Sequence, residues 1–332
     1  MNIKCLTFII FCFIFSNQQK IINKQKKIVN LAFAINNKFV NLLFISLYSL
    51  LENSDNNTIY NIFIQVKNNI VKEREKSIYN LEKKFFNCFI HFINMKREFI
   101  NAFRNSLDIS TYYRLKLPLL CPNINRIIHI DVDTIVLKDL TELYSLNFEG
   151  NYILGRLDKI TSELDSLGVY TQTYINAGVL LMDLYSLRKY NYDQKFMDYI
   201  YQHNNYKYLW HHAQTTLNYI CHDKIGVLRP KYHMWPFYSV EVLISLNNLL
   251  RKKYNESEFI SDYYDPFIVH FPGRFKKIMN SNSRYHKKFR EYSDKIQEIK
   301  ELKLESVRNI INYIFLTILI IIKILKKIFR VI

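Results

Sequence analysis

The stretch HIDVDTIVL, residues 129–137, combines a run of β-branched and aliphatic residues with two carboxylates, Asp131 and Asp133. Alternate residues of a strand point to the same side, so two acids facing the core would repel each other and lose their hydration. Both acids follow only a few strand residues, which predicts that they lie at the C-terminal end of the strand. Ligands of parallel sheets bind beyond that end, and a divalent cation there would turn the repulsion into attraction.

Strand and helix patterns alternate on both sides of this stretch. Runs of β-branched and apolar residues predict strands at 28–36, 58–66, 88–95, 151–158 and 174–184, and a strand that runs into a Pro-Gly turn at 267–278. Apolar residues at helical spacing predict helices at 39–53, 67–84, 105–122 and around 210–220. This alternation indicates an α/β domain in which helices flank a mostly parallel sheet.

The composition excludes several classes of protein. Hydrophobic residues make up 49% of the chain, enough to fill a core, so wholesale disorder is excluded. The 5 cysteines are dispersed and include no CxxC pair. Neither a disulfide framework nor a thiolate zinc site is therefore expected, and a reducing compartment is favoured.

Positive charge is concentrated near the C-terminus. The chain has 46 Lys and Arg against 29 Asp and Glu, a net charge of +17, and residues 274–332 hold 15 of the basic and 5 of the acidic side chains. A basic tail favours an anionic partner, for which a membrane surface competes with nucleic acid. Because no recognised nucleic-acid-binding module accompanies the charge, nucleic acid is not expected as a partner.

The N-terminus, MNIKCLTFIIFCFIF, places a single Lys before an apolar run. That run is shorter than the roughly 20 residues needed to span a bilayer. The following SNQQK lacks a small-x-small cleavage site. A signal peptide or short anchor, a peripheral apolar segment and a misassigned start all stay open for residues 1–25.

Four blocks of the sequence, taken in order, resemble those of glycosyltransferase family 8. They are VNLAFAINNKFVNLLFISLYSLLEN, STYYRLKLPLLCPNINRIIHIDVDTIVLKDL, YINAGVLLMDL, and HFPG with a lysine three residues beyond the glycine. A lone DxD pair occurs by chance in most proteins, but the four blocks in order are specific. The resemblance runs from about Ile28 to Lys277 and implies the A-type glycosyltransferase fold, with a Rossmann-like, mostly parallel central sheet flanked by helices.

The resemblance implies a metal site. Asp131, Asp133 and His270 would bind Mn²⁺ or Mg²⁺, and the ion would bridge the diphosphate of a nucleotide-sugar donor. Gly273 would let the backbone approach the diphosphate, and Lys276 would supply a positive charge to it. A haloacid-dehalogenase-type phosphatase is disfavoured, because its DxDxT motif would need threonine where this chain has isoleucine.

The resemblance also implies where the donor binds. Arg114 would lie near the sugar and diphosphate, and Asn36 and Asn37 would hold the nucleoside, for which uridine is expected. Residues 176–178 would pass under the sugar. The complete set of expected donor-binding residues is Ala34, Asn36, Asn37, Arg114, Asp131, Val132, Asn176, Ala177, Gly178, Gly273 and Lys276.

Gln214 and Asp158 are the expected catalytic residues. The family has a short Asp-Gln pair at the helix facing the reacting carbon, and this chain has Ala213 and Gln214 there. An amide is a poor nucleophile, so attack from the leaving group's own face is favoured, with the Gln214 oxygen steadying the oxocarbenium charge. Asp158, at an acidic sugar-binding position, could replace the missing acid.

The C-terminus predicts a membrane-associating helix. In residues 309–332, the side chains of Lys323, Lys326, Lys327 and Arg330 fall on one face of an otherwise apolar helix. Such a helix suits an anionic membrane interface, and packing on the protein's own core is the alternative. Three regions are expected: an apolar N-terminal segment at 1–25, a catalytic domain at 26–280 and a basic tail at 281–332.

The expected function is a metal-dependent retaining hexosyltransferase. It would transfer a sugar from a UDP-sugar to an oligosaccharide or lipid-linked acceptor, such as a lipopolysaccharide core, from the inner face of the cell membrane. Anchoring through the N-terminal segment is the alternative location. The alternative function is a non-catalytic nucleotide-sugar or glycan-binding descendant of the family, suggested by Ala213 and by Lys277 and Ile278, where the family usually has Pro and Trp.

Overall fold

The structure is a computed structural model that describes residues 26–67, 70, 72–99, 102, 108–158, 169, 173–202, 213–236, 254–272 and 283–296. The apolar N-terminal segment, the segment with Gly273 and Lys276, and the expected membrane-associating helix at 309–332 lie outside these residues.

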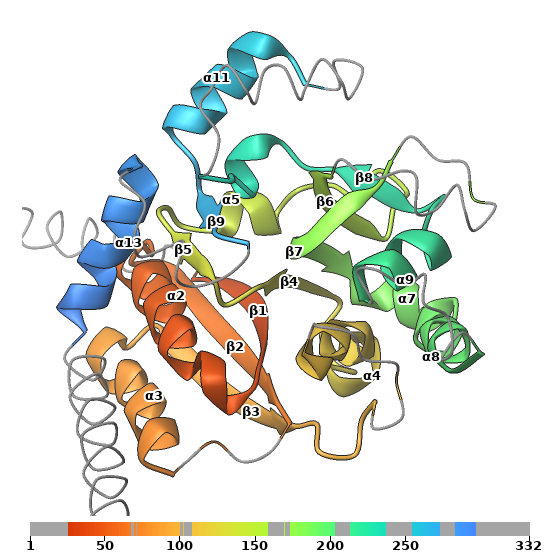
Figure 1. Cartoon of the computed structure of the whole chain (residues 1–332), viewed down its shortest axis with the longest axis horizontal. Helices are drawn as coiled ribbons and strands as arrows, with labels where there is room; N and C mark the ends of the chain where they lie inside the picture. The colour runs from red at the N-terminus through yellow and green to blue at the C-terminus, as the bar shows by residue number, and fades with distance from the viewer. Residues whose placement is uncertain are drawn as a thin grey trace, which may run out of the picture.

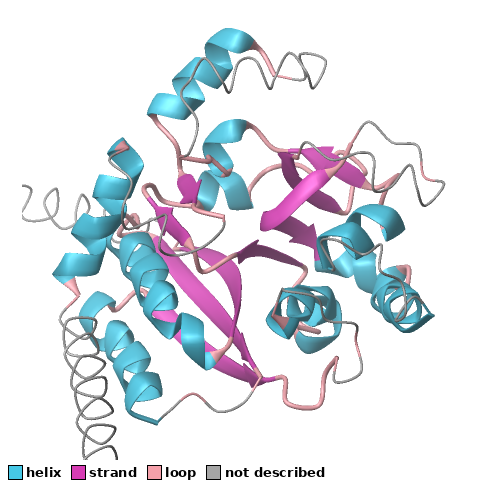
Figure 2. Ribbon diagram, viewed as in Figure 1, coloured by secondary structure: helices cyan, strands magenta, loops and turns pink. Residues whose placement is uncertain are grey.

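A mixed sheet of seven strands, in the order β3-β2-β1-β4-β7-β6-β8, forms the centre of the described part of the chain (Figure 2). Its strands are β1 (Lys27–Ile35), β2 (Thr58–Val66), β3 (Cys88–Asn94), β4 (Arg126–Ile130), β6 (Ile153–Leu157), β7 (Ile175–Asp183) and β8 (Ile225–Val227). Strands β3, β2, β1 and β4 run parallel, and β6 is parallel to β8. Only β7 is antiparallel to its neighbours among these strands. The expected α/β class with a mostly parallel sheet is confirmed.

Helices cover both faces of the sheet (Figure 1). Successive residues of β1 alternate between the faces, so Leu31 and Phe33 join one hydrophobic cluster while Ala32 joins the other. The first face carries α2 (Val40–Glu52), α3 (Lys72–Phe85) and α13 (Arg284–Lys295). The second carries the 3-10 helix η2 (Ile109–Lys116), α4 (Leu117–Leu120), α7 (Leu184–Lys189), α8 (Tyr192–Gln202) and α9 (Ala213–Ile220). Shorter elements are η1 (Asn37–Phe39), α5 (Thr141–Tyr144), η3 (Pro230–Tyr232) and α11 (Glu256–Tyr264).

The stretch HIDVDTIVL, residues 129–137, is divided between two sheets. Strand β4 ends at Ile130, and after a three-residue turn the chain enters β5 (Thr134–Val136), which pairs antiparallel with β9 (Ile268–His270). The register sets Thr134 opposite His270. The two acids therefore sit in the turn between the sheets, at the end of β4 as the sequence predicts.

Helix α2 holds the small sheet in place. The helix is apolar nearly all round, and it is buried nearly all round because the sheet, β5 and α13 enclose it. Its two buried serines bind β5: the Ser46 and Thr134 hydroxyls lie 2.8 Å apart, and Ser49 Oγ accepts a hydrogen bond from Val136 N at 2.9 Å. These bonds satisfy polar groups in the core and fix where β5 lies.

The first part of the expected basic tail packs against the core. Helix α13 buries Phe289 and Tyr292 on α2, and Asn53 Nδ2 donates a hydrogen bond to the Tyr292 hydroxyl at 2.7 Å. Lys295 Nζ lies 2.9 Å from a carboxylate oxygen of Glu52. No helix in the part of the chain that the structure describes has the length and apolarity of a membrane span.

Candidate metal and donor site

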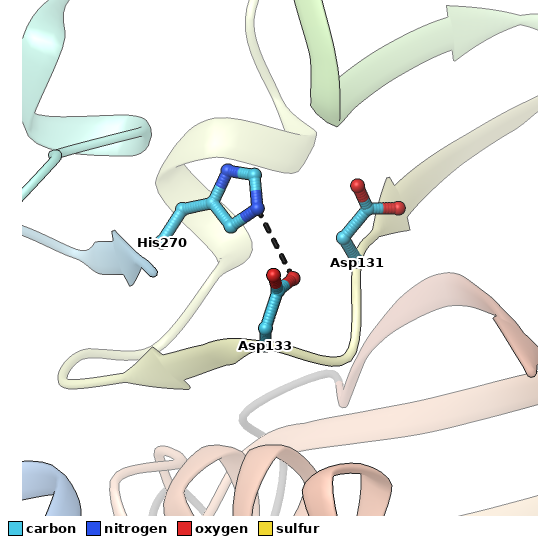
Figure 3. Close-up of side chains that lie close together, drawn as sticks. All are labelled: Asp131, Asp133 and His270. Carbon is cyan, nitrogen blue, oxygen red and sulfur yellow. Dashed lines mark hydrogen bonds and ion pairs between the residues drawn. The ribbon is translucent and has the colours of Figure 1, made fainter. Parts of the chain in front are cut away.

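Three possible metal ligands meet at the junction of the two sheets. Asp131 and Asp133 come from the turn after β4, and His270 ends β9. One ligand atom from each of the three lies within 4.8 Å of the others, and His270 Nε2 lies 3.1 Å from Asp133 Oδ1 (Figure 3). The ladder between β5 and β9 accounts for the meeting, because it places His270 beside the turn although 137 residues separate it from Asp133.

Asp131 is held by a buried arginine. Arg114 Nη2 donates to Asp131 Oδ1 at 2.7 Å, Nη1 donates to the carbonyl of Ala177, and Nε donates to the Thr111 carbonyl at 2.9 Å. Burial raises the pKa of the Asp131 carboxyl; Arg114 opposes the rise, and the neighbouring Asp133 adds to it.

His270 fills the space beside Gly178. A Cβ on Gly178 would lie only 2.3 Å from His270 Cε1, so any other residue there would collide with the imidazole. His270 Nδ1 lies 2.8 Å from His233 Nε2. Burial by itself lowers the pKa of His270, but the carboxylates of Asp133 and Asp131 outweigh burial and raise it above 6.5.

The expected catalytic residues form one hydrogen-bonded group. Asp158 Oδ2 accepts from Asn176 Nδ2 at 2.9 Å and from Gln214 Nε2 at 3.2 Å, and Gln214 Oε1 accepts from Ala177 N at 3.0 Å. Ala213, the position that is acidic in the resembling family, is buried. Asp158 thus supplies the carboxylate beside Gln214.

The residues expected at the nucleoside lie at the end of β1. Asn36 Oδ1 accepts from Lys38 N at 2.8 Å, and the Asn37 carbonyl accepts from Arg74 Nη1 at 3.1 Å. Asn36 Nδ2 donates to Asp108 Oδ2 at 2.6 Å, which brings a carboxylate to the end of β1 from a distant segment. Since β1 and β4 are parallel neighbours, this end and the metal cluster lie at the same edge of the sheet.

The structure describes two of the four remaining expected donor-binding residues, Ala34 and Val132. Val132 lies between the two acids and is buried, and Ala34 lies near the end of β1 and is partly buried. Gly273 and Lys276 lie outside the described residues.

The sequence did not indicate two residues that contact expected site residues: Asp108, which contacts Asn36, and His233, which contacts His270. Asp108 Oδ1 accepts a hydrogen bond from the backbone N–H of Ser110 at 2.9 Å, as a helix-capping residue does. A capping pattern in the sequence could therefore have indicated the position of Asp108. No motif marks His233, which reaches His270 only through the fold.

A family model described as Glycosyl transferase family 8 matches residues 30–277. The chain is 32% identical over 180 residues to General stress protein A of Bacillus subtilis, which covers 53% of this chain and 61% of that protein. It therefore spans about three fifths of that relative's length.

Two solved structures share the fold. Galactosyltransferase LgtC in complex with donor and acceptor sugar analogs matches with a TM-score of 0.68 and 17% identity, over 81% of this chain and 96% of that chain. Glycosyltransferase GlyE of Streptococcus pneumoniae matches with a TM-score of 0.58 and 19% identity, over 80% of this chain and 60% of that chain. At these identities the likeness shows the fold alone.

Proposed function

Because the chain belongs to glycosyl transferase family 8, we propose that it is a metal-dependent glycosyltransferase that transfers a hexose from a UDP-sugar to a glycan, with retention of the anomeric configuration. The observation that carries the proposal is the meeting of Asp131, Asp133 and His270 at the edge of the sheet where ligands bind. The solved LgtC complex with sugar analogs, on the same fold, supports sugar transfer as the reaction.

The three side chains fit Mn²⁺ or Mg²⁺. Asp131 and Asp133 offer carboxylate oxygens, the ligands that such hard cations prefer, and His270 offers Nε2. The raised pKa of Asp131 also fits, because a neighbouring cation would favour its ionised form. When bound, the ion would neutralise negative charge on the leaving nucleoside diphosphate.

Arg114 orients Asp131 in this proposal. Its guanidinium is buried and joins Asp131 to the Ala177 carbonyl, so it fixes the carboxylate relative to the strand that lies under the expected sugar position. A planar guanidinium suits this double contact better than an ammonium would. Its positive charge also lies at the same edge as the expected diphosphate.

Gln214 and Asp158 face the reacting carbon in this proposal. Gln214 is fixed at both ends of its amide, by Ala177 N and by Asp158 Oδ2. An amide is a poor nucleophile, so the acceptor hydroxyl attacks from the leaving group's side without a covalent enzyme intermediate. The bond from the sugar's anomeric carbon to the diphosphate breaks as the new bond forms, and the departing diphosphate takes the hydroxyl proton. The Asp158 carboxylate and the Gln214 oxygen stabilise the positive charge that develops on the sugar ring.

The acceptor and the location are proposed from the tail. The tail at 281–332 follows a catalytic domain at 26–280, and the basic apolar pattern at 309–332 suits an anionic bilayer surface. A lipid-linked glycan, such as a lipopolysaccharide core, would be within reach of an enzyme held at the cytoplasmic face. Anchoring by residues 1–25 is the alternative.

The proposal is tested by following hydrolysis and transfer of several UDP-sugars with Mn²⁺, for the wild type and for Asp131→Ala and Asp133→Ala. Each substitution removes a carboxylate of the cluster, so turnover is expected to fall at least about a hundredfold. Glu149→Gln, at an exposed carboxylate on the loop before β6, is the control and should keep wild-type turnover. Unchanged turnover in both alanine variants would contradict the proposal.

The second candidate is a non-catalytic nucleotide-sugar-binding protein. Ala213 favours it, because the acid of the family's Asp-Gln pair is missing and Asp158 is already bonded to two amides. Binding of UDP-sugars measured by calorimetry, with neither hydrolysis nor transfer for any donor, would select this candidate.

A further inference from the structure

The side chain of His233 contacts that of His270, the expected metal ligand. The segment after η3 runs beside β9: Met234 N donates to the Ile268 carbonyl at 2.8 Å, and His270 N donates to the Met234 carbonyl at 2.8 Å. This backbone pairing sets the two histidine rings 4.9 Å apart between centroids, at an interplanar angle of 33°. The proximity of the rings is thus a product of the backbone register.

The ring of His233 is packed on its other sides. It is fully buried, and the Trp235 ring meets it edge to face at 6.2 Å between centroids. The Arg156 guanidinium lies 4.1 Å from the centre of the Trp235 ring, and Arg156 Nη1 donates to the His233 carbonyl at 3.2 Å. These contacts leave the His233 imidazole little freedom to turn.

The hydrogen bond between the rings restricts where protons can sit. A neutral imidazole has one N–H donor and one bare nitrogen acceptor. A cation can bind His270 Nε2 only if that atom is bare, which puts the proton on His270 Nδ1. Because Nδ1 lies 2.8 Å from His233 Nε2, the latter must then be the acceptor. In the opposite arrangement His233 Nε2 donates, and His270 Nε2 carries the proton toward Asp133.

We propose that His233 is a positioning residue of the metal site: its Nε2 accepts the Nδ1 proton of His270 and so keeps His270 Nε2 bare and aimed at the cation. The inference rests on the proposed function, since it assumes the metal site formed by Asp131, Asp133 and His270. Outer partners of this kind fix the tautomer and the orientation of metal-binding histidines.

When both rings are neutral, the two arrangements make a pair of states that differ only in proton placement. One accepts the metal and the other excludes it. In the accepting state His233 Nδ1 carries a proton for which none of the described residues offers an acceptor, and this unpaired donor favours the excluding state when no metal is bound. Metal binding should therefore move both histidines together to the Nδ1–H form.

The first test measures Mn²⁺ affinity alone, from the loss of the free-ion signal in electron paramagnetic resonance. His233→Leu removes the acceptor and should weaken binding about 10- to 100-fold, whereas His233→Gln, whose amide oxygen can replace Nε2, should stay within about threefold of the wild type. His286→Leu, a buried histidine on α13 outside the cluster, is the control and should match the wild type. Asp133→Ala should not bind.

The second test uses nuclear magnetic resonance of ¹⁵N-histidine-labelled wild-type protein, with and without Mg²⁺. Two-bond proton–nitrogen correlations should show both His233 and His270 protonated at Nδ1 when Mg²⁺ is bound. A proton on Nε2 of either ring in the loaded protein would overturn the proposal. This readout decides the question even if His233→Leu fails to fold.

The outcomes separate the two proposals. If the wild type and His233→Leu bind Mn²⁺ equally while Asp133→Ala does not bind, the metal site stands and the role of His233 is wrong. If the wild type binds no Mn²⁺, both fail.

Discussion

Two carboxylates one residue apart are tolerated in this chain because the strand that leads to them ends at Ile130. The backbone N–H of Asp131 bonds to the Gly178 carbonyl at 2.7 Å, and the carbonyl of Asp133 accepts from Phe271 N at 2.8 Å. The acids are thus anchored to different strands, β7 and the end of β9, and neither has to face a closed core. Each acid also has a nitrogen partner: Arg114 Nη2 lies 2.7 Å from Asp131 Oδ1, and His270 Nε2 lies 3.1 Å from Asp133 Oδ1.

Gly178 gives a sharp test at the scale of a single residue. Gly178→Ala would place a Cβ 2.3 Å from His270 Cε1 and 2.6 Å from Nδ1, and the ring can move away only by breaking its contacts with Asp133 and His233, which hold its two nitrogens. We expect His270 to be displaced and Mn²⁺ affinity to fall at least about tenfold, as measured by titration calorimetry.

Gly150→Ala is the matched control for this prediction. Gly150 has a φ of +82° but open space around its Cβ position, so alanine there should cost about 1 kcal/mol of stability through backbone strain. Its Mn²⁺ affinity should not change. Equal Mn²⁺ affinities for Gly178→Ala and the wild type would show that the imidazole does not depend on this glycine.

Contacts between site residues could be predicted from the sequence only where a motif contains those residues. The blocks around Asp131, Asp133 and His270 indicated a common site, and the structure brings the three together, while their role as metal ligands stays a prediction. His233 was not predictable, because its contact with His270 depends on the register between β9 and the segment after η3. Asp108 meets Asn36 across 72 residues for a similar reason.

At the scale of elements, the loop from β5 to α5 is fastened by one carboxylate. Asp139 Oδ2 accepts from Asp55 N and from the Tyr60 hydroxyl, each at 2.9 Å, and Oδ1 accepts from Thr141 N at 2.9 Å. Burial by itself raises the pKa of the Asp139 carboxyl, but the hydrogen bonds from Thr141 and from the Asp55 backbone outweigh it and hold the pKa below 3.8. The loop therefore depends on the ionised form of Asp139.

The lowered pKa predicts how stability depends on pH. A carboxyl with a depressed folded-state pKa contributes stability above its unfolded pKa of about 3.9, and this contribution is lost as the pH falls through the folded value. Asp139→Asn should lower the free energy of unfolding at pH 7 by about 1–2 kcal/mol, since the side chain is only partly buried. The loss should shrink as the pH falls below the unfolded pKa of about 3.9 and through the lowered folded pKa, because the wild-type carboxyl is then protonated in both states.

Urea unfolding at pH 7, 4 and 3 checks this prediction. The control is Asp265→Asn, at an exposed carboxylate paired with Lys138, which should change stability by less than about 0.5 kcal/mol. A destabilisation by Asp139→Asn that stays equal at pH 7 and pH 3 would contradict the assigned role of the ionised carboxylate.

Most long helices and strands could be predicted from local sequence patterns, but the pairing of the strands could not. Residues 58–66 match β2 and residues 39–53 match α2 nearly end to end, because long runs of one periodicity are strong signals. Strands β5 and β8 have three residues each, too few for a recognisable sequence pattern. The antiparallel direction of β7 was not predictable either, because the sequence holds no signal for strand direction. The split of residues 129–137 between two sheets arises from β9, which is distant in the chain.

At the scale of the whole molecule, the proposal joins a sugar-transfer site to a membrane-associating tail. The basic residues Lys323, Lys326, Lys327 and Arg330 should draw the tail to anionic lipids, each contributing about 1 kcal/mol near the surface. Replacing all four with glutamine in the full chain should weaken binding to phosphatidylserine vesicles at least tenfold in a sedimentation assay.

Hydrolysis of a UDP-sugar in solution should not change in that variant, because the proposed metal ligands Asp131, Asp133 and His270 lie outside the substituted segment. Vesicles of neutral lipid are the control and should bind both proteins weakly and equally. Retention of full affinity for the anionic vesicles by the glutamine variant would show that the basic face does not hold the protein at membranes.

The central claim is that one divalent cation is bound by two acids of the β4–β5 turn and by the histidine that ends β9. Anomalous diffraction from a crystal soaked with Mn²⁺ and UDP, recorded near the manganese absorption edge, tests it most directly. The account predicts one strong peak within bonding distance of Asp131, Asp133 and His270 Nε2. A peak elsewhere with none at these residues, or no peak at saturating Mn²⁺, would contradict it.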